Sequence, residues 1–163
     1  MDAAEEVLLD VNTMAKGKDY FSVGDWEVSQ DNTMLAWAED AVGRRQYVIK
    51  FRNLATGETY ADEVKGVSPN IVWADDNKTL FYVENDPTTL LTTKVKKHVV
   101  GTPSSQDVLV YTEKDDSFYM GVGRTRDDKF ICITVDSTVS SEARCAPAND
   151  PKEFVVLAPR QRD

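Results

Sequence analysis

His98 is the only histidine in the chain, so it decides which hydrolytic chemistry these residues could perform. A serine or cysteine hydrolase needs a nucleophile, a base and a residue that orients the base. His98 falls in the middle of an expected strand, and the chain contains no Gly-x-Ser-x-Gly sequence, which would present a nucleophilic serine on a sharp turn. We therefore expect no catalytic residue here, and expect His98 to pack in or on a sheet.

Residue types that could bind metals or nucleotides are present, but their spacing in the sequence does not match that of such sites. One histidine with Cys132 and Cys145 does not make a zinc ligand set. The acidic run Glu113–Asp116 lacks the spacing and the central glycine of an EF-hand. Gly121-Val122-Gly123 is not followed by an expected helix, as a nucleotide-binding loop would be. We expect no metal and no cofactor.

Cys132 and Cys145 fall on neighbouring expected strands. If the turn between them is centred on Thr138 and Val139, they face each other across the hairpin, where cross-strand pairs can approach disulfide distance. Two cysteines do not form the disulfide framework of a small secreted domain. The expectation is therefore two free, packed thiols in a reducing compartment.

The charge of the chain limits the classes of partner that it is expected to bind. Its 28 acidic and 19 basic residues give a net charge of −9, which argues against a nucleic-acid binder because phosphate contacts need a concentrated basic surface. The same charge attracts basic ligands over long range. No apolar run is long enough for a membrane span, and the acidic start does not read as a signal peptide. These features predict a cytoplasmic protein without membrane or nucleic-acid partners, and a periplasmic parent stays open.

Short strands broken by turns follow one another from about residue 19. They repeat as three units of four strands, with steps of 48 residues from Tyr47 to Val95 and again to Ala143. Similar turns join the first and second strands of the units: Gln30-Asp31-Asn32, Asp75-Asp76-Asn77 and Arg126-Asp127-Asp128. Aspartate and asparagine suit such turns because their side chains bond nearby backbone amides.

The repeat predicts an all-β fold, a partial β-propeller of about three four-stranded antiparallel blades. The blades lie near residues 19–66, 67–116 and 117–163, after a lead-in over residues 1–18 with one short helix capped by Asp10 or Asn12. Second strands such as Met34–Glu39 are apolar on both faces, as a blade packed between two others requires. Because three blades do not close a ring, the chain is either part of a larger propeller or assembles from several copies.

Many stretches resemble the oligopeptidase B branch of the prolyl oligopeptidase family, in order and over nearly the whole chain. They are Glu6–Asn12, Ala38–Asp40, Arg44–Tyr47, Phe51–Glu58, Val72–Asp76, Thr89–Leu91, His98–Thr102, Gln106–Tyr111, Glu113–Asp116 and Leu157–Arg160. The resemblance implies a serine peptidase with a seven-bladed propeller and an α/β-hydrolase domain in the same polypeptide. That domain carries the Ser–Asp–His triad, so no catalytic residue is carried over to this chain.

The resemblance also implies a role for the segment. The family hydrolyses short peptides after Lys or Arg, and its propeller gates access to the active site. Its two domains open and close through interdomain salt bridges, for which Glu39, Asp40, Arg44 and Arg45 are the candidates. The alternative is a non-catalytic scaffold propeller that binds partner proteins. The full length of the gene, with or without a later Gly-x-Ser-x-Gly, distinguishes the two.

Three blades in isolation leave two outer faces bare. Apolar residues assigned to those faces are Leu35, Trp37, Val48, Ile131, Ile133 and Val155. Soluble monomers rarely expose such a patch, so the isolated chain is expected to self-associate. The competing expectation is a monomer whose N-terminal helix and C-terminal tail fold over the exposed blades.

Overall fold

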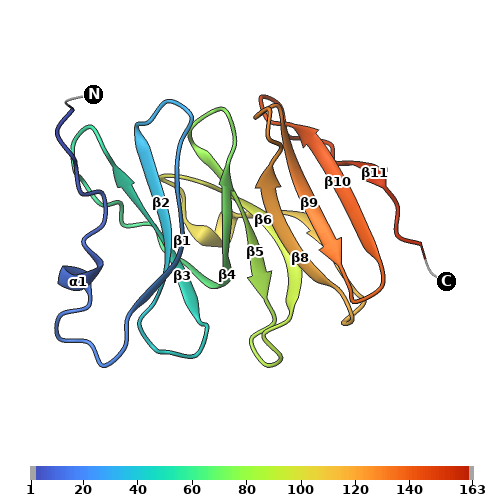
Figure 1. The fold of residues 1–163 in the computed structure, drawn as a ribbon, viewed down its shortest axis with the longest axis horizontal. Coiled ribbons are helices and arrows are strands. Elements are labelled where there is room, and N and C mark those ends of the chain that lie inside the picture. The colour runs from blue at the N-terminus through green and yellow to red at the C-terminus, as the bar shows by residue number, and fades with distance from the viewer. Residues whose placement is uncertain (1–2, 162–163) are drawn as a thin grey trace.

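The computed structural model describes residues 3–161 as two antiparallel β-sheets with very little helix (Figure 1). Sheet A has seven strands in the order β1-β2-β3-β4-β5-β6-β7, and sheet B has four in the order β11-β10-β9-β8. The elements are α1 (Val11–Met14), β1 (Ser22–Val28), β2 (Met34–Asp40), β3 (Tyr47–Asn53), β4 (Val64–Trp73), β5 (Thr79–Asn85), β6 (Thr92–Val99), the 3-10 turn η1 (Ser104–Gln106), β7 (Val108–Thr112), β8 (Tyr119–Arg124), β9 (Phe130–Asp136), β10 (Ser141–Pro147) and β11 (Val155–Ala158). The expected all-β class is confirmed.

Strand β4 changes its partner half-way along its length. Its first half pairs with β3 up to Val67, which also faces Glu84 of β5, and its second half pairs continuously with β5 from Ile71 onward. Pro69 lies at the break, where a residue without an N–H cannot continue the ladder. Gly66, at φ 69°, accommodates a shift of register in the first half. Two groups of strands therefore share one strand and form a single sheet.

The turns β1–β2, β4–β5 and β8–β9 repeat in detail, as their sequences predict. Asp31 accepts a hydrogen bond from the backbone N–H of Thr33, Asp76 from that of Lys78, and Asp127 from that of Lys129. The residue after each aspartate is Asn32, Asn77 or Asp128, and all three have φ near 60°. Asn and Asp tolerate this left-handed conformation better than other non-glycine residues. The three turns thus share one backbone conformation and one pattern of hydrogen bonds.

Strand β5 is buried because a hydrophobic core lies on each of its faces. Leu80 and Tyr82 belong to the core shared with β2, β3 and β4. Phe81 and Val83 belong to the second core, in which sheet B packs against sheet A. The alternation of side chains along a strand sends successive residues to opposite faces, so a strand between two packed layers has to be apolar throughout.

The expectation that Leu35, Trp37, Ile131 and Ile133 lie on bare outer faces is wrong, since all four are buried. Ile131 and Ile133 point into the core between the sheets. The other face of β9, which includes Phe130 and Thr134, is the exposed one. Of the other two residues in that expected set, Val48 is partly buried and Val155 is exposed.

The N-terminal lead-in covers part of the free face of β1 and β2. Leu8 and Leu9 lie with Leu35 and Trp26 around an apolar groove of about 450 Å³, and the Leu8 carbonyl accepts a 2.8 Å hydrogen bond from Arg52. Asp10, one of the two residues expected to cap the helix, is the N-cap of α1. Its side chain accepts a hydrogen bond from the Thr13 N–H at 3.0 Å. The competing expectation of a folded-over N-terminal segment thus describes this end of the molecule.

Cys132 and Cys145 face each other across the β9–β10 hairpin and form a disulfide. The expected cross-strand placement is confirmed, and the expectation of two free thiols is wrong. The hairpin turn brings the two Cα atoms to 4.1 Å, close enough for bonding.

Within residues 3–161, no helix has the length and apolar character needed to cross a membrane.

Candidate functional site

The hairpin loops of the two sheets gather at opposite ends of the molecule (Figure 1). We call end A the end formed by the turns 29–33, 74–78 and 125–129, at the top of Figure 1. End B is formed by the loops 41–46, 86–91 and 137–140, which follow β2, β5 and β9 at the bottom of that view. The four residues predicted for the interdomain surface, Glu39, Asp40, Arg44 and Arg45, all lie at end B.

Glu39 is buried at the end of β2 and has partners within the sheet. Its carboxylate accepts from the indole N–H of Trp37 at 2.9 Å and lies 2.8 Å from the ammonium of Lys50. Burial acts to raise the pKa of Glu39, but the hydrogen bonds from Lys50 and Trp37 hold it below the ordinary value. Glu39 is therefore an ionised group neutralised inside the chain.

Asp40 is also buried and shapes the loop that follows it. It accepts from the backbone N–H groups of Val42 at 2.8 Å, Gly43 at 3.0 Å and Arg45 at 2.9 Å. The same pattern of acceptance from residues two and three positions later recurs at Asp86 and Ser137, in the other two loops of end B. Asp40 thus fixes the backbone of the loop, and its own carboxylate is not exposed to solvent.

Arg44 and Arg45 are the exposed members of the predicted set. Neither guanidinium has an ion-pair partner among residues 3–161. Arg45 is held at φ 56°, a conformation that costs a non-glycine residue free energy. The structure therefore separates the four candidates into two that build the loop and two that face solvent from it.

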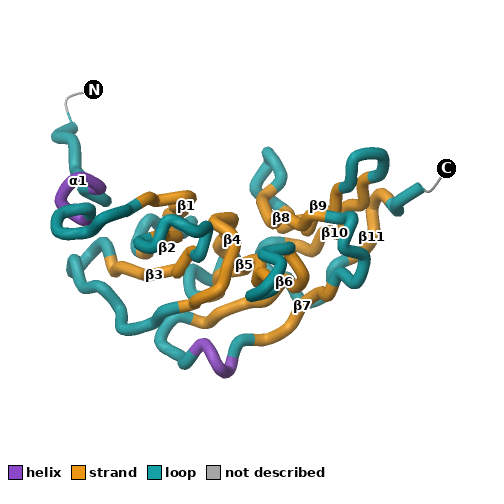
Figure 2. Tube along the Cα trace, turned by 90° about the horizontal axis from the view of Figure 1, so that it is seen from below, coloured by secondary structure: helices purple, strands orange, loops and turns teal. Residues whose placement is uncertain are grey.

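The inner side of the molecule is formed by β1, β4 and β8, which lie side by side in Figure 2. Asn70 of β4 bonds both backbone groups of Val122 in β8, at 2.6 Å to the N–H and 3.0 Å to the carbonyl. Asp25 of β1 accepts from the Ile71 N–H at 3.3 Å. These bonds tie consecutive inner strands together without a shared ladder.

A hollow of about 330 Å³ lies between these strands, with Asp25, Glu27 and Arg124 among its lining residues. Burial raises the pKa of Asp25, and burial together with the charge of Asp25 raises that of Glu27, against the opposing effect of Arg124. Arg124, which also lines the hollow, pairs with Asp75.

His98 lies completely buried between two carboxylates. Its ring nitrogens are 2.7 Å from Asp62 and 2.7 Å from Asp107, and its ring stacks on Phe51. Both ring nitrogens are therefore engaged by aspartate side chains. Asp107 also accepts from Tyr82, whose pKa is raised by burial and by that carboxylate. Neither ring nitrogen is available as a base, and the expectation that His98 packs in the sheet is confirmed.

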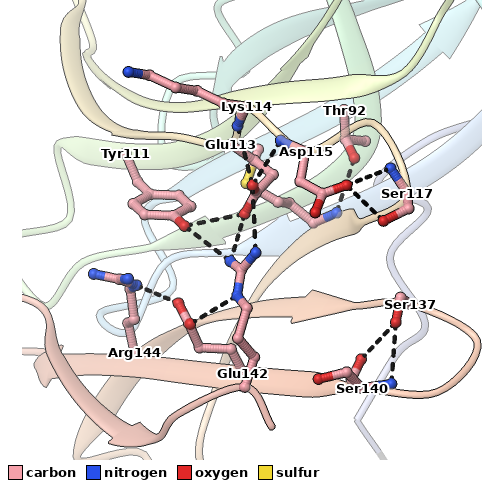
Figure 3. A network of polar contacts seen from close by, with 12 residues as sticks. Thr92, Tyr111, Glu113, Lys114, Asp115, Ser117, Ser137, Ser140, Glu142 and Arg144 are labelled. Atoms are coloured by element: carbon pink, nitrogen blue, oxygen red, sulfur yellow. Dashed lines mark hydrogen bonds and ion pairs between the residues drawn. The ribbon is translucent and has the colours of Figure 1, made fainter. Parts of the chain in front are cut away.

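A second polar network fixes the segment after β11 (Figure 3). Arg160 donates to Glu113 at 2.6 Å and to Glu142 at 3.0 Å, and its guanidinium lies over the ring of Phe118. Burial acts to raise the pKa of both glutamates, but the bonds from Arg160 hold both below their ordinary value. This network joins the β7–β8 connection to β10 and to the C-terminal segment.

The polar clusters in the part of the chain that the structure describes do not amount to a catalytic or metal centre. No group of three or more His, Cys, Asp or Glu within residues 3–161 could hold a metal ion. What the arrangement offers is a displayed basic loop at end B and an acidic inner hollow.

The comparison with family models decides the affiliation. The model described as "Prolyl oligopeptidase, N-terminal beta-propeller domain" matches residues 1–163. The chain belongs to this family. Its sheets are therefore part of the N-terminal β-propeller domain of a prolyl oligopeptidase-type protein, and the resemblance seen in the sequence is confirmed.

Individual relatives support the same family assignment. Dipeptidyl aminopeptidase BI from Pseudoxanthomonas mexicana is 66% identical over 161 residues, which are 99% of this chain and 22% of that protein. Oligopeptidase B from Leishmania major superposes with a TM-score of 0.91 at 32% identity, over 98% of this chain and 23% of that one. Oligopeptidase B from Trypanosoma brucei, in a closed form with covalently bound antipain, gives 0.85 at 30% identity, over 96% and 22%. The chain thus spans less than a quarter of the length of these relatives.

Sequence reasoning missed the partners of His98 and the role of Asp40. Asp62 and Asp107 are 36 and 9 residues from His98, so no local pattern links the three. Asp40 could have been assigned from its place at the end of a second strand, because Asp86 directly follows the next second strand.

Proposed function

We propose that this chain is the first part of the propeller of an oligopeptidase B-like serine peptidase and has no peptidase activity alone. The observation that carries the proposal is the family match over residues 1–163. The placement of His98, with both nitrogens engaged by carboxylates, supports the absence of catalysis in this part.

The strands divide, in this proposal, into three blades of a seven-bladed ring. The first blade consists of β1–β3 with the first half of β4, the second of the rest of β4 with β5–β7, and the third of β8–β11. The boundaries fall near residues 19–66, 67–116 and 117–163, after the lead-in 1–18. The repeated turns of end A and the neighbouring inner strands β1, β4 and β8 support this division.

The propeller gates access to the α/β-hydrolase domain of the same polypeptide. Flexible short peptides pass and folded proteins do not. Arg44 and Arg45 face that domain, while Glu39 and Asp40 hold the loop that carries them. The closed form known for the Trypanosoma brucei relative supports a mechanism in which the domains meet and separate.

The substrates are short basic peptides cleaved after Lys or Arg. The acidic hollow with Asp25 and Glu27, and the net charge of −9, support the attraction of such peptides. For the location, the Cys132–Cys145 disulfide favours the periplasmic alternative over the expected cytoplasmic one, and cell fractionation with rapid thiol alkylation distinguishes the two.

The test uses the intact polypeptide that contains this chain, beside residues 1–163 alone. A blocked Arg–Arg fluorogenic amide is expected to be cleaved by the intact polypeptide only, and a serine-reactive phosphonate should abolish that cleavage. Turnover by residues 1–163 that the phosphonate blocks, or no phosphonate labelling of the intact polypeptide, contradicts the proposal.

A second candidate, release of dipeptides from free N-termini, is favoured by the 66% identity to dipeptidyl aminopeptidase BI. An Arg–Arg amide with a free amino group, compared with the same amide carrying a blocked one, separates the two candidates. An oligopeptidase cleaves both substrates. A dipeptidyl aminopeptidase cleaves only the unblocked one.

A further inference from the structure

Each of the three loops at end B projects one exposed aliphatic side chain. Val42 is 59% exposed, Leu90 41% and Val139 88%. Their loops are structural equivalents, since each follows a second strand and begins with a side chain that accepts from the backbone N–H groups two and three positions later. Exposed aliphatic residues also occur elsewhere on the molecule, but at end B one recurs in each of three equivalent loops.

End A provides the comparison within the same chain. The tips of its three turns, residues 30–33, 75–78 and 126–129, contain only polar and charged residues. Both ends use the same kind of hydrogen-bonded turn, so turn geometry does not demand an aliphatic residue at end B. Solubility would favour polar residues at both ends.

The backbone at end B carries strain in residues that do not favour it. Leu90 has φ 60° and Arg45 has φ 56°, whereas the left-handed positions of the end A turns hold Asn32, Asn77 and Asp128. A branched aliphatic or long basic residue in this conformation costs free energy that Asn or Gly would lower. Strain of this kind persists at sites where a particular side chain is needed.

The two buried side-chain oxygens that lack a hydrogen-bond partner among residues 3–161 also adjoin end B. They are Oδ1 of Asn85, directly before the loop 86–91, and Oγ of Ser140, in the loop 137–140. Structural costs are thus concentrated at the end that displays the aliphatic tips and the unpaired Arg44 and Arg45.

We propose that Val42, Leu90 and Val139 form a docking row that contacts the catalytic domain of the same polypeptide when the two domains close. Arg44 and Arg45, in the first loop of the row, face carboxylates on that domain. The inference rests on the proposed function. In the Leishmania major relative the matched part is 23% of the chain, so most of the polypeptide lies outside it and can supply the partner surface. Aliphatic contacts flanked by charges suit a surface that closes and reopens, because interdomain interfaces are small and partly polar.

The experiment places p-benzoylphenylalanine at position 42, 90 or 139 of the intact polypeptide, and at position 32, 77 or 128 as matched controls at end A. After irradiation, mass spectrometry identifies the cross-linked segments. We expect the end B positions to cross-link to the domain that carries the phosphonate-reactive serine, at yields at least fivefold above those of end A. Equal yields from both ends, or end B cross-links confined to other β-sheet segments or to a second copy, overturn the docking row.

A second variant separates docking from folding. Leu90→Asn relieves the strain, so the melting temperature of residues 1–163 should rise or stay unchanged. In the intact polypeptide it should lower the cross-linking yield from position 139. An unchanged yield overturns the proposal. If the intact polypeptide has no phosphonate-reactive serine, the proposed function fails instead, and this outcome is distinguishable because it does not depend on the cross-links.

Discussion

At the scale of single residues, His98 shows how a candidate base becomes a structural residue. It joins Asp62, on the β3–β4 connection, to Asp107, directly before β7, and the two side chains have relative exposures of only 9% and 2%. Removing one partner of a buried hydrogen bond is costly because the other partner stays buried and unsatisfied. The stability of sheet A should therefore depend strongly on this imidazole.

We predict that His98→Gln lowers the free energy of unfolding of residues 1–163 by about 1–3 kcal/mol, because it leaves a buried aspartate without its hydrogen-bond partner. Urea denaturation followed by circular dichroism at pH 7 measures the change. Lys97→Gln, on the same strand and without an ion pair among the described residues, should change it by less than about 0.5 kcal/mol. A cost below about 1 kcal/mol for His98→Gln would mean that the two carboxylates find other partners.

A double-mutant cycle tests the pairing itself. Asp62→Asn should cost less in the His98→Gln background than in the wild-type chain, by about 1 kcal/mol or more, because its hydrogen-bond partner is already gone. Additive costs would show that the two residues do not interact.

At the scale of elements, the end A turns couple stability to pH. The side chain of Thr33 and backbone N–H groups bond Asp31, and the side chain of Thr125 and the Lys129 N–H bond Asp127, which holds the pKa of both aspartates below the ordinary value. A carboxyl whose folded-state pKa is depressed contributes stability above its unfolded pKa and loses it as pH falls through the folded value. The contribution is therefore present at neutral pH and disappears below about pH 4.

We predict that Asp31→Asn with Asp127→Asn lowers the melting temperature at pH 6, and that the difference from wild type shrinks as the pH falls to 3. Thermal melts at half-unit pH steps measure it. Asp150→Asn, which removes only an exposed ion pair with Lys152, should leave the pH profile unchanged. A difference that is constant or grows toward acid pH contradicts the assignment.

The β9–β10 hairpin is the element that the disulfide constrains. A bridge between residues 13 apart removes conformational entropy from the unfolded chain, by about 3 kcal/mol for a loop of this size. Reduction should lower stability by about 2–3 kcal/mol and speed amide exchange in sheet B more than in sheet A. Hydrogen exchange with and without a phosphine reductant measures this. Equal acceleration in both sheets would mean that the bridge acts on the whole chain.

The elements were predictable to the extent that they depend on local sequence. The three Asp-containing turns, the second strands and the Asp10 cap follow from residues within a few positions of each other. The pairing of β4 with two partners was not predictable in this way. It depends on Pro69 and Gly66, which interrupt the ladders within one continuous strand.

At the scale of the whole molecule, the error over Leu35, Trp37, Ile131 and Ile133 concerns what covers a strand. The residues that face outward in a sheet are set by register and by the packing of neighbours, and a shift of one residue exchanges the two faces. Apolar composition identifies a strand as buried without saying what covers it. In this chain sheet A covers β9 from one side, and the lead-in covers part of β2.

Two apolar faces nevertheless remain at opposite extremes of the arc of strands (Figure 2). One is the groove beside Trp26, next to Leu8 and Leu9. The other is the outer face of sheet B, where Tyr119, Phe130 and Val155 are exposed. Each large apolar side chain left in water forgoes about 1.5–3 kcal/mol relative to full burial. The faces differ, so one copy can place its sheet B against the Trp26 groove of the next, which is a head-to-tail contact.

We predict that residues 1–163 self-associate in this head-to-tail manner, with a weight-average mass that rises with concentration in light scattering coupled to size exclusion. Trp26→Lys and Phe130→Lys should each yield a monomer near 18.3 kDa, because each removes one of the two complementary faces. An equimolar mixture of the two variants should form a dimer and nothing larger, since each partner keeps the face that the other lacks. If Trp26→Lys alone still dimerises, copies meet through sheet B on both sides, and the head-to-tail arrangement is wrong. A wild-type chain that stays monomeric at high concentration and binds no hydrophobic dye contradicts self-association altogether.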